Sequence, residues 1–310
     1  MKILFLTNSL NYRGTTNAIL DYAYYNQELL GNESIIGYDP SSQYEQDVGN
    51  EDKVVEEVKS KFRVVNYSND IEKVANVVKP DIIYKLDAGG EIDNKSNIKL
   101  AHHAVFQFKN DTISAYVSKW LSDTMTDGKI PFVPHIVNLP DANKNYREFF
   151  NIPKDAVIVG RHGGYKTFDI PFVKRYIKET IDLQNVYYLF LNTEPFIKHS
   201  KVIHINSTFD RQKLSNFIDT CDVMLHARQR GESFGLAIAE FLFHNKPVLA
   251  CYDGLDKNHH TLTEYLYKDE MTLHSLICNV PRTSGDYKSS VKNYSPSRVM
   301  KSFNKYFIEN

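Results

Sequence analysis

Short apolar runs alternate along the chain with amphipathic stretches whose apolar residues recur every three or four positions. In the first half, this pattern predicts strands at residues 2–7, 34–38, 63–67, 81–85, 100–106, 115–118 and 132–137. It predicts helices at residues 16–30, 51–62, 70–79 and 118–126. The strands are apolar throughout and do not alternate with polar residues, which is typical of a parallel sheet covered by helices on both faces.

A polar stretch at residues 138–153, with Pro140 and Pro153, interrupts the pattern, which then starts again. The second half predicts strands at residues 156–160, 186–191, 201–205, 223–227 and 247–251, and helices at 170–180, 210–220, 234–244 and 258–267. We therefore expect two doubly wound, Rossmann-like α/β domains, at residues 1–145 and 146–295. Residues 296–310 predict a terminal helix whose apolar face suits either domain, and we expect it to pack back on the first domain. Two such domains in series would place a ligand in a cleft between their strand ends.

Composition narrows the class of protein. The chain has 310 residues and a formal net charge of −1, which gives no reason to expect nucleic acid as a partner, and membrane contact would be peripheral at most. Residues 1–7 predict a core strand and are too short for a signal peptide. Cys221, Cys251 and Cys278 have no metal-ligand spacing and predict reduced core thiols in a cytoplasmic protein.

Two glutamates, Glu232 and Glu240, lie eight positions apart across a turn that opens an almost wholly apolar helix. Glu240 falls on the buried face of that helix, where a carboxylate is costly unless a partner bonds it. The amino end of a helix beside the carboxyl end of a strand is a ready anion site. The combination suits a nucleotide sugar, with phosphates at the helix start and hydroxyl groups on the glutamates. The alternative is one capping glutamate and one buried glutamate paired to an arginine.

A second group of residues follows the strand at 156–160, where Arg161 and Lys166 flank Gly163 and Gly164. The glycines let the backbone approach a ligand closely, and the two cations supply positive charge for an anion. The alternative is a tight strand-to-helix turn with two solvated cations.

Residues 156–265 resemble the family 4 type of GT-B glycosyltransferases, whose signature is two glutamates separated by seven residues, and the resemblance extends over most of the chain. A subset with relatives in bacteria and large viruses is more similar still. It shares the runs Gly160-Arg161-His162-Gly163-Gly164, Phe190-Leu191-Asn192-Thr193, Leu225-His226-Ala227-Arg228 and Asn245-Lys246-Pro247-Val248.

The resemblance implies that Glu240 binds the ribose hydroxyls of a nucleotide-sugar donor and that Glu232 approaches the transferred sugar as a catalytic residue. It further implies a donor site that includes Arg161, Gly163, Gly164, Lys166, Arg228, Ser233, Phe234, Gly235 and Leu236. The two glycines between Arg161 and Lys166 depart from the commonest family pattern.

Two features of the first domain complete the predicted site. Relatives place a histidine near the reacting sugar, and His103 matches it better than its neighbour His102 does; the alternative is a hydrogen-bonded core histidine. Gly14 and Thr15 lie in the loop before the first helix, which either contacts donor or acceptor or is an ordinary connection.

The sequence thus predicts a GT-B glycosyltransferase that moves a sugar from a nucleoside-diphosphate sugar to a hydroxyl group on a glycan, lipid-linked or protein-linked acceptor. The resemblance implies retention of anomeric configuration, with no cofactor and no obligatory metal. No Asp-x-Asp motif, Walker loop or zinc spacing occurs in the chain. Two other classes stay open, a nucleotide-sugar epimerase and a non-catalytic subunit that binds a nucleotide sugar or glycan.

Overall fold

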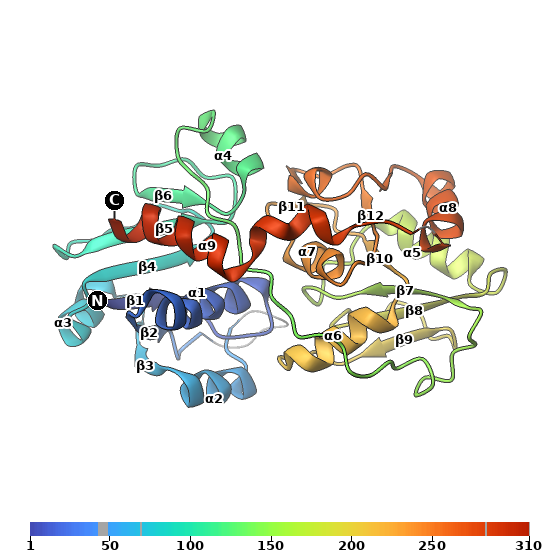
Figure 1. The fold of residues 1–310 in the computed structure, drawn as a ribbon, viewed down its shortest axis with the longest axis horizontal. Helices are drawn as coiled ribbons and strands as arrows, with labels where there is room; N and C mark the ends of the chain where they lie inside the picture. Colours follow the sequence, from blue (N-terminus) through green and yellow to red (C-terminus); the bar gives the residue numbers. More distant parts are fainter. Residues whose placement is uncertain (43–48, 69, 283, 310) are drawn as a thin grey trace. The chain divides into compact units, whose positions relative to one another are not determined.

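The computed structural model describes residues 1–42, 49–68, 70–282 and 284–309. The chain divides into two compact units, which we call unit 1 (Met1–Ile136 with Tyr294–Asn310) and unit 2 (Val137–Asn293) (Figure 1). The sequence-based boundary at residues 145 and 146 therefore lies inside unit 2. No helix among the described residues has both the length and the apolar character needed to cross a bilayer.

Unit 1 is a six-stranded parallel sheet in the order β3-β2-β1-β4-β5-β6. Its strands are β1 (Lys2–Leu6), β2 (Glu33–Tyr38), β3 (Arg63–Asn66), β4 (Ile82–Asp87), β5 (Lys99–Ala104) and β6 (Ile113–Tyr116). Its helices are α1 (Gly14–Leu30), α2 (Asp52–Lys61), α3 (Ile71–Val78), α4 (Lys119–Thr126) and α9 (Pro296–Phe303), and α9 continues into a π-helical turn at Asn304–Glu309.

Alternate residues of the unit 1 strands face opposite layers, as the pleat of a strand requires. Leu4, Leu6 and Ile83 pack with the apolar residues of α3. On the other face, Phe5 and Tyr84 pack against Phe303, and α9 lies along α1 (Figure 1). The terminal segment therefore completes the core of unit 1, and Lys99 Nζ also donates to the carbonyl of Ile308 at 3.0 Å.

Unit 2 repeats this architecture with a parallel sheet in the order β14-β12-β10-β7-β8-β9. Its strands are β7 (Val157–Arg161), β8 (Val186–Leu191), β9 (Val202–Ile205), β10 (Val223–His226), β12 (Val248–Cys251) and β14 (Leu266–Tyr267). Its helices are α5 (Pro171–Thr180), α6 (Arg211–Thr220), α7 (Leu236–Phe243) and α8 (Glu270–Asn279), and a small parallel pair joins β11 (Gly231–Glu232) to β13 (Asp256–Lys257). Numbered from β7, the six-stranded sheet has the strand order of unit 1, the order of the doubly wound fold.

The polar stretch after residue 137 belongs to unit 2 because it is hydrogen-bonded to α6. Asn216 Oδ1 accepts from the backbone nitrogen of Asn143 at 2.9 Å, and Thr220 Oγ1 accepts from that of Tyr146 at 2.8 Å. A side-chain amide and a hydroxyl group in a helix carry no sequence signal for such a partner, so the pattern alone set the boundary too late.

Two predicted elements are wrong, and four observed elements, namely α8, β14 and the short strands β11 and β13, were not predicted. Residues 132–137 form no strand beyond an isolated bridge between Tyr116 and Phe132, since Pro131 and Pro134 supply no amide for a ladder. Residues 258–267 form a 3-10 turn (Asn258–Thr261) and then β14, instead of one helix. The pattern did not predict α8, which begins with a capping box at Asp269.

Candidate functional site

The order of strands in unit 2 defines where a ligand site is expected. Strands β7 and β10 are neighbours in the sheet, but the chain leaves β7 toward β8 and leaves β10 toward β12. In open parallel sheets, ligands bind at such a switch point, outside the carboxyl ends of the strands. The turn after β7 contains the two glycines, and the turn after β10 contains Glu232 and leads into α7. The fold therefore brings the two predicted groups of residues to one edge.

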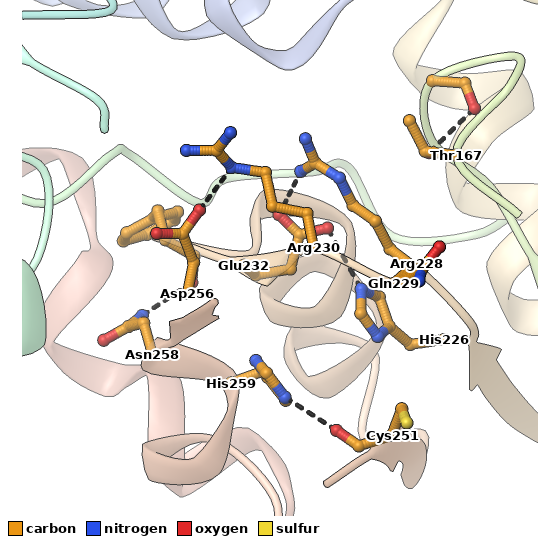
Figure 2. Close-up of polar contacts among 12 residues, drawn as sticks. Thr167, His226, Arg228, Gln229, Arg230, Glu232, Cys251, Asp256, Asn258 and His259 are labelled. Atoms are coloured by element: carbon orange, nitrogen blue, oxygen red, sulfur yellow. Dashed lines mark hydrogen bonds and ion pairs between the residues drawn. The ribbon is translucent and has the colours of Figure 1, made fainter. Parts of the chain in front are cut away.

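Glu232 is held by the last residue of β10 and by a residue of the turn that follows it (Figure 2). His226 Nε2 lies 3.0 Å from Glu232 Oε1, and Arg228 Nη1 donates to Oε2 at 3.0 Å. Burial acts to raise the pKa of Glu232, but the hydrogen bond from His226 and the charge of Arg228 outweigh it and bring the pKa to about 2. Glu232 is therefore a fixed anion with both oxygens bonded.

The turn before Glu232 is tied to the segment that follows β12. Arg230 Nε donates to the fully buried carboxylate of Asp256 at 2.7 Å (Figure 2). Gly231 has φ +77°, and a Cβ there would lie 2.0 Å from the carbonyl oxygen of Asp256, so only glycine fits. His259 lies beneath, with its Nε2 2.9 Å from the carbonyl oxygen of Cys251; burial and the nearby charge of His226 lower the pKa of His259 to about 4.

The amino end of α7 has features that favour an anion. Gly235 precedes it with φ +89°, and the helix has neither a side-chain cap nor an acidic residue in its first turn. Asn258 Nδ2 donates to the carbonyl of Phe234 at 2.7 Å and fixes the turn, while Ser233 and Phe234 are buried. No side chain therefore caps the first amides of α7, at Gly235 and Leu236, or places negative charge at the positive end of the helix dipole.

Glu240 lies one turn further along α7, and the prediction that it is buried is confirmed, since it is 8% exposed. His162, the first residue after β7, places Nε2 3.1 Å from Glu240 Oε2, at ion-pair distance but without hydrogen-bond geometry. The His162 ring stacks on Phe241 with centroids 5.7 Å apart. The sequence showed His162 within a shared run, but no pattern assigned it a partner.

Arg161 has a different environment from the one expected of a phosphate ligand. It is 4% exposed, and its guanidinium donates to the carbonyl of Asn192 at 3.1 Å, to Thr193 Oγ1, to the carbonyl of Gly164 at 2.8 Å and to Thr167 Oγ1 at 2.7 Å. These bonds hold the glycine turn closed onto the end of β8. In this structure Arg161 shapes the turn through these bonds.

The other predicted residues of this turn are more accessible. Gly163 lies directly over the Arg161 guanidinium, with φ +150°, and its carbonyl accepts from Asn192 Nδ2 at 2.8 Å. Lys166 is exposed, and the structure gives its ammonium group no hydrogen bond or ion pair with any of the described residues. Lys166 is therefore the cation of this turn that is available to a ligand.

In unit 1, the structure places His103 in the core. It is 0% exposed, its Nδ1 is 2.7 Å from the hydroxyl of Tyr84, and Phe307 of the terminal segment covers its ring with centroids 5.1 Å apart. Burial, followed by the nearby charge of His135, lowers the pKa of His103 well below its ordinary value. This is the environment of a core histidine, the alternative reading of the sequence, and it offers no route to a sugar in unit 1 as folded here.

The predicted loop residues and an unpredicted polar cluster lie at the strand ends of unit 1. Gly14, which is exposed, and Thr15 begin α1. His102 is buried with Nε2 2.9 Å from Asp87 Oδ1, and Lys85 Nζ is 3.5 Å from Asp87 Oδ2. Because Lys85, Asp87 and His102 are spread over two strands, their spacing in the sequence did not connect them.

No group of three or more histidine, cysteine, aspartate or glutamate residues within the described ranges could hold a metal ion. Cys221 and Cys251 are buried as predicted, whereas Cys278 is exposed on α8.

No protein-family model matches the chain, and no curated protein matches its sequence. Solved structures do match over almost the whole length. HepE of Anabaena in complex with UDP-glucose superposes with a TM-score of 0.73 at 13% identity, covering 98% of both chains. A glycosyltransferase from Rickettsia africae has a TM-score of 0.69 at 12% identity, covering 100% of this chain and 99% of its own.

Sucrose-phosphate synthase from Thermosynechococcus elongatus also matches, with a TM-score of 0.66 at 12% identity and coverage of 99% and 95% of the two chains. At these identities the similarity establishes the fold. The chain has the GT-B fold, two α/β units each built on a parallel sheet, as the sequence predicted.

Proposed function

We propose that this protein is a glycosyltransferase whose unit 2 binds a nucleoside-diphosphate sugar. One observation carries the proposal. Two buried or half-buried carboxylates, Glu232 and Glu240, flank the uncapped amino end of α7 at the switch point of a doubly wound sheet. That arrangement offers a helix dipole to a diphosphate and carboxylate oxygens to hydroxyl groups.

The donor we would test first is UDP-glucose, because HepE, which shares the fold, was solved in complex with it. In unit 2, the diphosphate would meet the amides at the start of α7 and the exposed cation of Lys166. Glu240 would accept from the ribose hydroxyls, and Glu232 would lie toward the sugar. Arg161 acts through the glycine turn that it holds in place.

The chemistry that we infer is transfer with retention, without a bound metal as an obligatory partner. Glu232 has both oxygens bonded and a pKa of about 2, so it is a poor general base at neutral pH. Its fixed negative charge can instead stabilise positive charge that develops on the sugar. We infer that the acceptor hydroxyl attacks on the face from which the diphosphate leaves, and that the leaving phosphate takes the proton.

A thermal-shift screen with UDP, GDP, ADP and their sugar conjugates, with EDTA present, tests the donor site. A ligand at about 100 times its dissociation constant adds about 2.7 kcal/mol to stability, which corresponds to several degrees for a unit of this size. We expect Glu240→Ala to abolish the shift. Glu179→Ala, which removes an exposed carboxylate from α5, is the control and should leave the shift intact.

Donor turnover separates the proposal from its rivals. An epimerase would convert the nucleotide sugar to an isomer without acceptor, and a binding subunit would shift in melting temperature without releasing nucleoside diphosphate. Nuclear magnetic resonance of the product would report its anomeric configuration, and an inverted product would refute retention. A folded protein that is not stabilised by any of the nucleotides would refute the donor site.

A further inference from the structure

Glu240 has an incomplete set of partners for a buried carboxylate. Its Oε2 lies 3.1 Å from His162 Nε2. For Oε1 the structure shows no hydrogen bond and no ion pair to any residue in the ranges that it describes. A buried carboxylate normally accepts several hydrogen bonds, so Glu240 has acceptor capacity that protein groups leave unused.

His162 is held rigidly beside this carboxylate. Its backbone continues β7 directly after Arg161, whose four described bonds fix the following turn. Its ring is nearly parallel to that of Phe241, with 17° between the planes, and Phe241 is the residue next to Glu240 on α7. The side chain of His162 is 10% exposed. The ring therefore cannot move away without losing its stacking partner.

We propose that His162 is a positioning residue that fixes the Glu240 carboxylate in the orientation that binds a ribose. The site would then select ribonucleotides over 2′-deoxyribonucleotides. This inference rests on the proposed function. The imidazole occupies the space next to Oε2 and restricts rotation of the carboxylate. Oε1 is then presented in one orientation to a ligand hydroxyl. His162 does not touch the ligand in this arrangement, since its Nε2 is itself buried.

Loss of the imidazole has two consequences. The carboxylate would be free to rotate, so a hydroxyl bond to it would cost conformational entropy on binding. It would also lose the one side chain of the described residues that lies within ion-pair distance of it. Both effects act on the bonds to the ribose hydroxyls, and they have less effect on a 2′-deoxynucleotide, which keeps only its 3′ hydroxyl. Selectivity should therefore fall more than overall binding to the diphosphate.

Calorimetric titration of UDP, ADP and GDP, each beside its 2′-deoxy counterpart, tests the inference. For the nucleotide that binds best, we expect the wild-type protein to favour the ribonucleotide roughly tenfold or more, as a hydrogen bond to a charged group implies. In His162→Phe, which keeps an aromatic ring against Phe241, we expect that ratio to fall at least roughly fivefold while the deoxynucleotide affinity changes little. His162→Gln, whose amide can reach the carboxylate, should recover part of the ratio.

A matched control exists in the same unit. His199 and Asp182 form a pair at the surface, with Nε2 3.1 Å from Oδ1, the same separation as in the buried pair. His199→Phe should leave the ratio unchanged. His162→Met, a second variant without a donor, takes the place of His162→Phe if the latter does not unfold cooperatively.

The possible results distinguish a failure of the positioning role of His162 from a failure of the proposed donor site. An unchanged ratio in a folded His162→Phe or His162→Met protein, with Glu240→Ala abolishing binding, would overturn the positioning role and leave the donor site standing. A wild-type ratio near one would also overturn it. No binding of any ribonucleotide by the wild-type protein would remove the proposed function itself.

Discussion

His135 makes the stability of unit 1 depend on pH. Its ring is 5% exposed and lies among Tyr22 and His103, with the Tyr22 hydroxyl 3.2 Å from Nδ1. Tyr22 donates its proton to the carbonyl of Pro134 at 2.8 Å, so His135 Nδ1 is the donor in the contact with Tyr22. Burial lowers the pKa of His135 to about 3, because an imidazolium would lose its hydration there.

The sign of the effect follows from where the proton binds. Above the unfolded pKa of about 6.5, His135 is neutral in both states and contributes nothing. Below it, the unfolded chain takes up a proton that the folded unit does not bind, so stability falls as pH falls, down to the folded pKa of about 3. Between pH 7 and pH 5 the loss is about 2 kcal/mol, from about 1.36 kcal/mol per pH unit over about 1.5 units.

The assay is urea unfolding at pH 7 and pH 5, followed by the fluorescence of Trp120. The chain has one tryptophan, and it lies on α4, so the signal reports on unit 1. We expect the free energy of unfolding of the wild-type protein to fall by about 2 kcal/mol more than that of His135→Phe over this range. Buried histidines away from this ring, such as His259 of unit 2, titrate equally in both proteins and cancel in the comparison.

The control is His274→Phe, which changes an exposed residue on α8 of unit 2 and should follow the wild-type curve. Parallel losses of stability in wild-type and His135→Phe proteins would refute the reasoning, since they would mean that the buried ring takes up a proton as readily as a solvated one.

Two further predictions concern unit 2. Arg161→Lys keeps the positive charge but not the planar guanidinium, so the carbonyl groups of Asn192 and Gly164 lose their hydrogen-bond donors. We expect the free energy of unfolding to fall by about 3 kcal/mol, which would appear as faster hydrogen exchange in β7 and β8. Unchanged hydrogen exchange would contradict this account. Gly231→Ala places a Cβ 2.0 Å from the carbonyl oxygen of Asp256, so it should lower the melting temperature of unit 2 and weaken nucleotide binding. Gly90→Ala is the control, because its added Cβ meets nothing within 4 Å, and it should change neither quantity. A Gly231→Ala protein that melts and binds as the wild type does would show that the turn can yield.

The architecture could be predicted from the sequence because a strand buried on both faces is a continuous run of apolar residues. Both sheets follow from uninterrupted apolar runs such as Ile3–Leu6 and Val186–Leu191. The restart of the pattern after residue 153 indicates a second unit, which in the structure begins at Val137. The run at 132–137 has the same apolar character, but prolines deprive it of the amides that a strand needs. Hydrophobicity therefore located buried chain correctly and did not always distinguish strand from buried coil.

The sequence could predict only those parts of the site that are set by residues close together in the chain. The eight-residue separation of Glu232 and Glu240 and the burial of Glu240 follow from one helix and its turn. Two of the partners of Arg161 are Asn192 and Thr193, about thirty positions away, and no spacing rule connects them to it. The environment of His103 depends on Phe307, about two hundred positions away, so a strand position alone could not tell a core histidine from an exposed one.

Glu232 and Glu240 differ in how many hydrogen bonds and ion pairs the protein gives their carboxylates, and this difference indicates different roles. Glu232 has a bond on each oxygen and a pKa of about 2, so it enters any reaction as a placed charge. Glu240 is more deeply buried on the apolar helix, yet within the described chain only His162 lies within ion-pair distance of its carboxylate. A carboxylate with few protein partners keeps acceptor capacity that the hydroxyl groups of a ligand can fill on binding. That unused capacity is why we place the ribose at Glu240 and the reacting sugar at Glu232.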